Sequence, residues 1–340
     1  MGYNRITIWD DKELTQPEKS VAEIDKKNVS KKRKISKNNV RGYSGEIRNT
    51  SVIGYLKRKR WGFRHSLYAL FLGFFIQLIF IIPAMINNAS EIITSGSSAV
   101  TTESIVDAVM SAEMLVWIQM AMYLGWIFVA LYITYRKGLN SLAKDIWLKF
   151  RWIRDISFGL VIAAALRGIE MSTLWLLDTL GVDLTGADNS SVFMETTGVW
   201  KYILLFGIVS LIGPIAEEIL FRGIMMQGII KTLRRTSPVP RTWFGEGVYN
   251  AYPPLFQLFS KLKLFLNKYK YILAVIISST IFGFMHYQGG ETFGQWLVVI
   301  ITGLLGVVLA LVTLKTRRLG LAIVIHIGFN GSAVIMSLMA

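Results

Sequence analysis

Long apolar stretches separated by polar segments dominate the chain after residue 65. There are seven of them, and most are close to the ~20 residues that an α-helix needs to cross a bilayer, with the fifth the shortest. We therefore expect an all-α fold, a polytopic membrane helical bundle of about seven transmembrane helices. The predicted spans are approximately 66–86, 114–135, 156–177, 202–230, 271–285, 293–314 and 319–338.

The loops between the predicted spans alternate in charge. Three contain no Lys or Arg, and they alternate along the chain with loops that contain six, eight and three. Because Lys and Arg gather in cytoplasmic loops, the pattern predicts a multi-pass protein of the cell membrane with its N-terminus in the cytoplasm. The loops without basic residues are 87–113, 178–199 and 287–292, and the basic loops are 136–155, 231–270 and 315–318.

Two polar segments have a character of their own. Residues 1–65 carry 17 Lys and Arg against seven Asp and Glu, which predicts a disordered cytoplasmic arm before a membrane helical domain over 66–340. We expect the arm to contact anionic lipid headgroups. Its sparse aromatic residues disfavour RNA binding, so nucleic acid is not an expected partner. Within 231–270, the Leu and Phe spacing over 255–265 predicts an amphipathic helix on the inner leaflet.

Composition supports a membrane protein and narrows the chemistry. The 340 residues are 53% hydrophobic, with a mean hydropathy of +0.46, which is too apolar for an ordinary soluble protein. The chain has no cysteine, so disulfides, a thiol nucleophile and cysteine metal ligands are excluded. A metal would need His and Glu, and the only histidines are His65, His286 and His326.

Charged residues interrupt two of the apolar stretches. Glu217, Glu218 and Arg222 lie in the fourth. Ionisable groups are expensive in hydrocarbon, so they usually face a protein interior or a wet cavity and are candidates for function. Glu218 and Arg222 are four apart and can pair on one helix face, whereas Glu217 points about 100° away and keeps its carboxylate free. Arg167 and Glu170 in the third stretch are interpreted as a structural pair.

Two further polar pairs occur inside predicted helices. Phe282 and His286 are four apart in the fifth span, and His326 and Asn330 are four apart in the seventh, so each pair shares one helix face. Counted at ~1.5 Å per residue from the inner charges, these residues and Glu217 reach overlapping depths. We therefore expect the side chains of three helices to meet at one site.

The chemistry of this set indicates a hydrolytic site. A glutamate in a partly dry cavity can act as a general base toward water, and imidazole and amide groups can donate hydrogen bonds to a developing oxyanion. Taken singly, each residue has a structural interpretation, as a packing pair, a core hydrogen bond or a contact between helices. The coincidence of both intramembrane histidines with the carboxylates favours the functional interpretation.

Three motifs of the chain resemble those of the CPBP family, the CAAX proteases and bacteriocin-processing enzymes, also called the Abi family. The resemblance covers approximately residues 200–335. Each motif alone is weak, but all three in order, in separate membrane helices, are fairly specific. The motifs are Glu217-Glu218-x-x-x-Arg222, Phe282-x-x-x-His286 and His326-x-x-x-Asn330.

The resemblance implies an intramembrane endopeptidase with a helical core. By carry-over, Glu217 and His286 would activate the attacking water, and His326 and Asn330 would stabilise the oxyanion. The neighbouring Glu218 and Arg222 would support the site, together with Phe282. Trimming of prenylated CAAX proteins and processing of bacteriocin or pheromone peptides are the implied activities, so the expected partner is a membrane protein or peptide substrate.

Metal dependence stays open at this stage. The family is often labelled metalloprotease, and a metal-free, glutamate-dependent mechanism has also been argued for it. We expect no cofactor, because an imidazole that donates to an oxyanion cannot also ligate and no H-E-x-x-H helix is present. Zinc held by Glu217, His286 and His326 is the alternative.

Two other functions compete with proteolysis. A non-catalytic membrane immunity or scaffold protein could use the same fold. A transporter with the carboxylates as a proton relay is disfavoured, because the sequence shows no repeat symmetry and no pair of broken helices.

Overall fold

The computed structural model describes residues 61–94, 112–138, 141–187, 198–234, 253–287 and 289–339, and these residues form helices and connecting segments with no strand. The expected all-α membrane fold is confirmed. Of the predicted basic arm, residues 1–60 lie outside the described ranges. The helices are α3 (Phe63–Thr94), α5 (Ala112–Lys137), α6 (Leu142–Asp145), α7 (Trp152–Thr179), α9 (Gly198–Tyr202), η1 (Ile203–Ile212), α10 (Gly213–Glu217), η2 (Glu218–Met226), α11 (Gln227–Arg234), α13 (Pro253–Lys268), α14 (Lys270–Phe284), α15 (Phe293–Thr316) and α16 (Gly320–Met339).

Among the described residues, six helices have the length expected of a membrane span, one fewer than the seven predicted, and the difference is α14. In the described part of the chain, six helices are long and apolar enough to cross a membrane, and α14 is a shorter apolar helix of 15 residues. A helix of that length rises ~22 Å, less than the ~30 Å hydrocarbon core. The fifth predicted span is therefore present as the shortest of the described apolar helices, and it alone separates the expected count of seven from the six long ones. The predicted amphipathic helix corresponds to α13.

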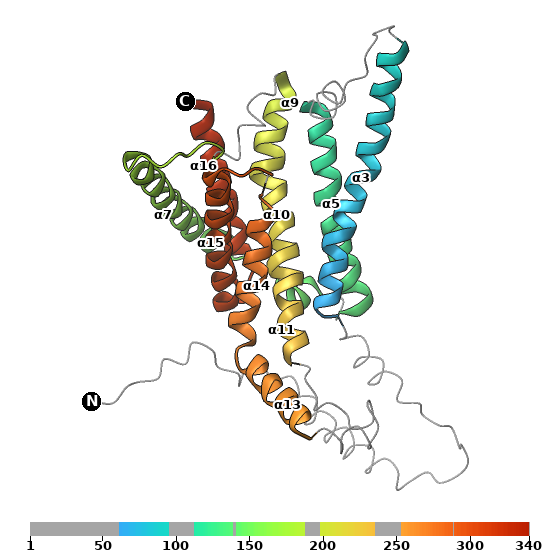
Figure 1. The fold of residues 1–340 in the computed structure, drawn as a ribbon, viewed down its shortest axis with the longest axis vertical. Helices are drawn as coiled ribbons and strands as arrows, with labels where there is room; N and C mark the ends of the chain where they lie inside the picture. Colours follow the sequence, from blue (N-terminus) through green and yellow to red (C-terminus); the bar gives the residue numbers. More distant parts are fainter. Residues whose placement is uncertain are drawn as a thin grey trace, which may run out of the picture. The chain divides into compact units, whose positions relative to one another are not determined.

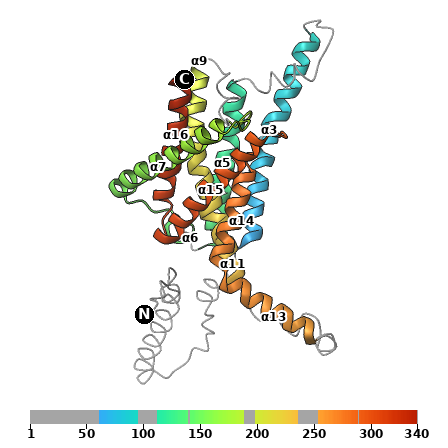
Figure 2. The same ribbon diagram turned by 60° about the vertical axis from the view of Figure 1, so that its left-hand side comes forward.

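The fourth span is one continuous helical run from Gly198 to Leu233. It switches from α-helix to π-helix in η1 and again in η2, with α10 between them. A π-helix is rare, and where it occurs it is frequently at a functional site. Figure 1 shows this run at the centre of the bundle, with α5 and α3 on one side and α14, α15 and α16 on the other, and Figure 2 shows α7 running obliquely across α16.

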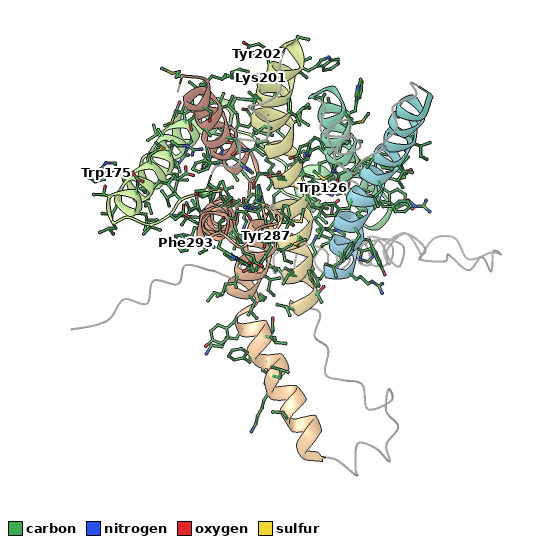
Figure 3. The ribbon with its side chains drawn as sticks, turned by 45° about the horizontal axis from the view of Figure 1, so that its top comes forward. Trp126, Trp175, Lys201, Tyr202, Tyr287 and Phe293 are labelled. Carbon is green, nitrogen blue, oxygen red and sulfur yellow. The ribbon has the colours of Figure 1, made fainter. Side chains whose placement is uncertain are left out.

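The run is the most buried of the long apolar helices, whereas α7 is the most exposed. In η2 every residue from Glu218 to Met226 is buried. Figure 3 shows the contrast: Trp126 lies among the helices, and Trp175 projects from the outer side of α7. Large apolar side chains such as Phe71, Phe75 and Val161 are also exposed. Exposed apolar surface on this scale fits contact with lipid rather than water.

Candidate active site

The adjacent glutamates stand where α10 passes into η2. Glu217 is 8% exposed and Glu218 is fully buried, while Arg222 is 1% exposed. Removing such charges from water costs several kcal/mol each unless they are paired and hydrogen-bonded. The structure supplies the pairing for Glu218, because Arg222 Nη1 donates to its Oε1 at 2.9 Å.

Arg222 also joins the fourth span to α14 and α15. Its Nη2 donates to the backbone oxygen of Gly306 at 3.2 Å, and its guanidinium lies 4.2 Å from the centre of the Phe282 ring. A Cβ at Gly306 would lie 3.0 Å from the Phe282 ring and 3.2 Å from Arg222 Nη2. The absence of a side chain at Gly306 therefore lets α15 approach this buried cation closely.

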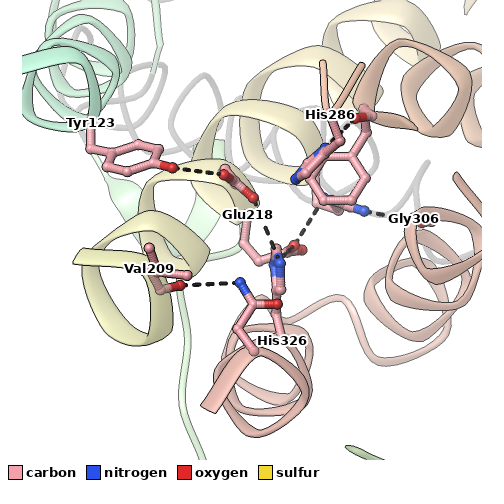
Figure 4. Close-up of polar contacts among 10 residues, drawn as sticks. Tyr123, Val209, Glu218, His286, Gly306 and His326 are labelled. Carbon is pink, nitrogen blue, oxygen red and sulfur yellow. Dashed lines mark hydrogen bonds and ion pairs between the residues drawn. The ribbon is translucent and has the colours of Figure 1, made fainter. Parts of the chain in front are cut away.

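His326 of α16 lies between the two glutamates. Its Nδ1 is 3.0 Å from Glu218 Oε1, and because a carboxylate only accepts, Nδ1 is the donor. Its Nε2 is 3.6 Å from Glu217 Oε2, which is beyond hydrogen-bond distance. The ring is therefore oriented by Glu218, and its second nitrogen faces Glu217. Figure 4 shows these contacts.

Glu217 receives a hydrogen bond that sequence reasoning missed. Tyr123 of α5 donates its hydroxyl to Glu217 Oε1 at 3.2 Å (Figure 4). Glu217 Oε2 is buried and has no hydrogen-bond partner among the described residues. Gly213 permits this contact, because a Cβ there would lie 3.1 Å from the Tyr123 hydroxyl. One carboxylate oxygen is thus held, and the other is left for a further ligand such as water.

His286 lies in the turn that follows α14. Its Nδ1 is 2.9 Å from the Phe282 backbone oxygen, so Nδ1 donates and Nε2 retains its lone pair. In the described part of the chain, His286 has no hydrogen bond to either glutamate. The Phe282 ring makes edge contacts with both histidines, at centroid distances of 4.9 Å to His286 and 5.7 Å to His326.

Asn330 follows His326 by one turn of α16. Its Nδ2 donates to the backbone oxygen of Val209 in η1 at 3.1 Å. An amide nitrogen carries two hydrogens, so one donor is committed to η1 and one is left. Asn330 thereby ties α16 to the helical run that carries the glutamates.

The second intramembrane pair is also present and joins α7 to α16. Arg167 pairs with Glu170, donates from Nη2 to the Phe329 backbone oxygen at 2.6 Å and from Nε to Ser332 Oγ at 3.2 Å. These bonds flank Asn330 in the sequence. The structural interpretation of Arg167 and Glu170 fits this helix-to-helix contact.

The seven residues singled out from the sequence gather on three helical segments. Five are linked to one another by direct contacts. His286 contacts one of the five, Phe282, and Asn330 lies one turn after His326 in α16. The five are Glu217, Glu218, Arg222, Phe282 and His326. The arrangement offers a buried carboxylate oxygen and an imidazole nitrogen facing each other, which is suited to holding and deprotonating water.

Zinc gains no support from this geometry. Among the described residues, no group of three or more His, Asp or Glu side chains is placed to hold a metal ion. A zinc site needs three or four protein ligands at ~2.0–2.2 Å. Glu217 and His326 face each other, but no contact among the described residues brings His286, the third proposed ligand, to both of them.

Comparison with known proteins gives one family. The model of the type II CAAX prenyl endopeptidase Rce1-like family matches residues 199–332. The match covers less than half of the chain and includes all seven residues above, while Tyr123 and Arg167 lie outside it. Searches of curated proteins and of solved structures gave no match. The three motifs lie within the matched residues, so residues 199–332 of this chain are similar to the Rce1-like family of CAAX prenyl endopeptidases.

Proposed function

We propose that this protein is an intramembrane endopeptidase that hydrolyses a peptide bond in a membrane-associated CAAX-type substrate, using Glu217 as the general base. The observation that carries the proposal is the state of the Glu217 carboxylate. One oxygen accepts a hydrogen bond from Tyr123, and the other is buried, unpartnered among the described residues and turned toward His326. The family of residues 199–332 supports the reaction class.

In the proposed reaction, a water bound at Glu217 Oε2 gives a proton to the carboxylate as its oxygen attacks the scissile carbonyl carbon. His286 helps to hold this water through the lone pair of Nε2. The tetrahedral intermediate then collapses, the carbon–nitrogen bond breaks, and the proton on Glu217 passes to the leaving amine. Water is consumed and an amine and a carboxylic acid are released, so the atoms balance.

His326 and Asn330 are proposed to stabilise the oxyanion. For this role His326 must carry a proton on Nε2 as well as the one that Nδ1 gives to Glu218. Two glutamates beside one arginine leave a net negative charge that compensates an imidazolium. Asn330 would contribute the amide hydrogen that Val209 does not use. Preorganised donors of this kind typically lower the barrier by ~3–4 kcal/mol each.

The test is cleavage of a farnesylated CAAX-type peptide by the full chain in proteoliposomes. Glu217→Gln keeps the shape and the contact with Tyr123 but cannot take a proton, so we expect the rate to fall by at least about 10²-fold. His286→Ala should also abolish detectable cleavage. Glu291→Gln is the control, because it neutralises an exposed glutamate outside the site and should leave the rate nearly unchanged.

Thermal unfolding of each variant separates lost catalysis from lost folding. Wild-type cleavage by a folded Glu217→Gln variant would refute the protease and favour the non-catalytic immunity or scaffold function, which predicts full biological activity for these variants. If the wild-type protein does not cleave the prenylated peptide, the proposed CAAX-type substrate is wrong and the natural substrate must be identified. Comparing membrane proteomes and secreted peptides from cells with wild-type or Glu217→Gln protein identifies it.

A further inference from the structure

A separate cavity of about 280 Å³ lies between the start of α7 and the junction of α15 with α16. Arg154, Lys315 and Arg318 line it together with the acidic Asp155. The rest of the lining is largely apolar and includes Phe158 as well as side chains of α15 and α16. None of these residues takes part in the proposed cleavage.

The charges in this pocket do not cancel. Asp155 is buried and accepts hydrogen bonds from Arg318 Nη1 at 2.7 Å and from the Arg151 backbone N–H at 2.7 Å. That carboxylate therefore balances Arg318. Among the described residues, Arg154 and Lys315 have no ion-pair partner. Two cations are left to face the cavity, which favours an anionic ligand.

Close backbone contacts join the start of α16 to the segment before α7, next to the pocket residues Asp155 and Arg318. The N–H groups of Leu319 and Gly320 donate to the carbonyl oxygens of Trp147 and Lys149 at 2.9 and 3.1 Å. A Cβ at Gly320 would lie 2.7 Å from Lys149 O and 2.8 Å from Asp155 Oδ2. The junction therefore admits only glycine at this point, and these contacts fix the start of α16 against the segment before α7.

The position of the pocket indicates which anion it suits. It lies at the ends of three apolar helices, beside the loops 136–155 and 315–318 whose charge predicts a cytoplasmic location. A free phosphate would need only the cations, whereas Phe158, Ile162 and Val312 offer an apolar surface for a hydrocarbon chain. Basic pockets between membrane helices on the cytoplasmic side are suited to phospholipid headgroups.

We propose that this pocket binds an anionic phospholipid of the inner leaflet, with its phosphate at Arg154 and Lys315 and its acyl chain along Phe158. The lipid would fasten α7 to α15 and α16 at their cytoplasmic ends. This site is distinct from the lipid contact expected for the N-terminal arm, because all of its residues lie in the membrane domain.

The experiment measures lipid binding to the purified, delipidated full chain. Phosphatidylglycerol is titrated in detergent, and the bound lipid is quantified by native mass spectrometry, with phosphatidylcholine as the zwitterionic comparison. We expect each removed cation to weaken phosphatidylglycerol binding about fivefold, so that the double variant Arg154→Gln/Lys315→Gln loses about 25-fold. Phe158→Ser should also weaken lipid binding, because it removes the apolar contact.

The matched control is Lys144→Gln/Lys149→Gln, which removes two exposed cations from the same predicted loop outside the cavity. This pair should bind phosphatidylglycerol like the wild type. An equal loss in the control, or no loss in Arg154→Gln/Lys315→Gln, overturns the pocket assignment. Equal binding of phosphatidylcholine overturns the preference for an anion. Displacement of the lipid by excess inorganic phosphate, with no effect of Phe158→Ser, makes the ligand free phosphate and overturns the lipid.

Discussion

At the residue scale, the site depends on the different hydrogen-bond partners of two adjacent carboxylates, Glu217 and Glu218. Glu218 forms an ion pair with Arg222 and accepts a hydrogen bond from His326, so its carboxylate has a structural role. The preceding residue, Glu217, accepts a hydrogen bond from a hydroxyl on one oxygen, and its other oxygen has no hydrogen-bond partner within the described residues. Two adjacent glutamates of the same type thus have different environments, which is the usual basis for different roles.

The hydrogen bond from Tyr123 should orient Glu217 for catalysis. Tyr123→Phe removes it and leaves the rest of the ring in place. A hydrogen bond to a charged group contributes about 1.5–3 kcal/mol, so we expect kcat to fall about tenfold or more, with KM nearly unchanged because the hydroxyl faces Glu217. The measurement is steady-state cleavage of the prenylated peptide.

The control for this prediction is Tyr132→Phe on the same helix, whose ring is exposed. It should leave both kinetic constants unchanged. A kcat of Tyr123→Phe equal to that of the wild type would show that the hydroxyl does not position the base. A raised KM would instead indicate contact with the substrate.

At the element scale, the contact between α14 and α15 holds Phe282 and the turn with His286 against the rest of the site. Gly283 lies next to Phe282 at this contact, and a Cβ there would be 2.6 Å from Val299 O and 3.1 Å from the Gly303 backbone. These neighbours are backbone atoms, which cannot rotate away. Close packing of glycines is a common way to bring membrane helices together.

Gly283→Ala should therefore separate α14 from α15. We expect a loss of about 1–3 kcal/mol in unfolding free energy from overpacking, together with reduced cleavage as His286 moves. The control is Gly168→Ala in α7, where a Cβ meets no atom within 4 Å and where alanine should be neutral or stabilising by up to about 1 kcal/mol. Thermal unfolding in detergent measures both, and equal melting temperatures would contradict the packing argument.

At the scale of the whole molecule, the charge asymmetry of the loops predicts the orientation in the membrane. The natural absence of cysteine makes this prediction simple to test, because a single introduced cysteine is the only thiol. The exposed Lys149 lies in a basic loop and the exposed Asp183 in a loop without Lys or Arg. Their positions should face opposite sides of the membrane.

A membrane-impermeant maleimide should label Asp183→Cys in intact cells and Lys149→Cys only after permeabilisation. The N-terminus and the lipid pocket are then on the cytoplasmic side. The reverse pattern would invert the topology and move the proposed pocket to the outer leaflet. Labelling of both positions in intact cells would contradict a bundle that separates these two loops.

Local periodicity was enough to predict the elements and part of the site. The spans follow from runs of apolar residues, and the pair of Glu218 with Arg222 follows from helix geometry alone, because residues four apart share a face. The same rule placed His326 and Asn330 together. The fifth stretch was expected over 271–285 as the shortest of the seven, and α14 has nearly these bounds, because polar and glycine residues follow Met285.

Contacts between distant segments could not be predicted this way. Tyr123 reaches Glu217 from a helix 94 positions earlier in the chain, and Asn330 meets a backbone oxygen of η1 that a sequence pattern does not reveal. The sequence by itself determined the helices, the motifs and the charge of the loops at the helix ends, because these depend on residues that are neighbours along the chain. Only the tertiary structure decided which oxygen of Glu217 is held, how Phe282 stands between the histidines and where two unpaired cations meet an apolar pocket, because packing between helices sets those distances.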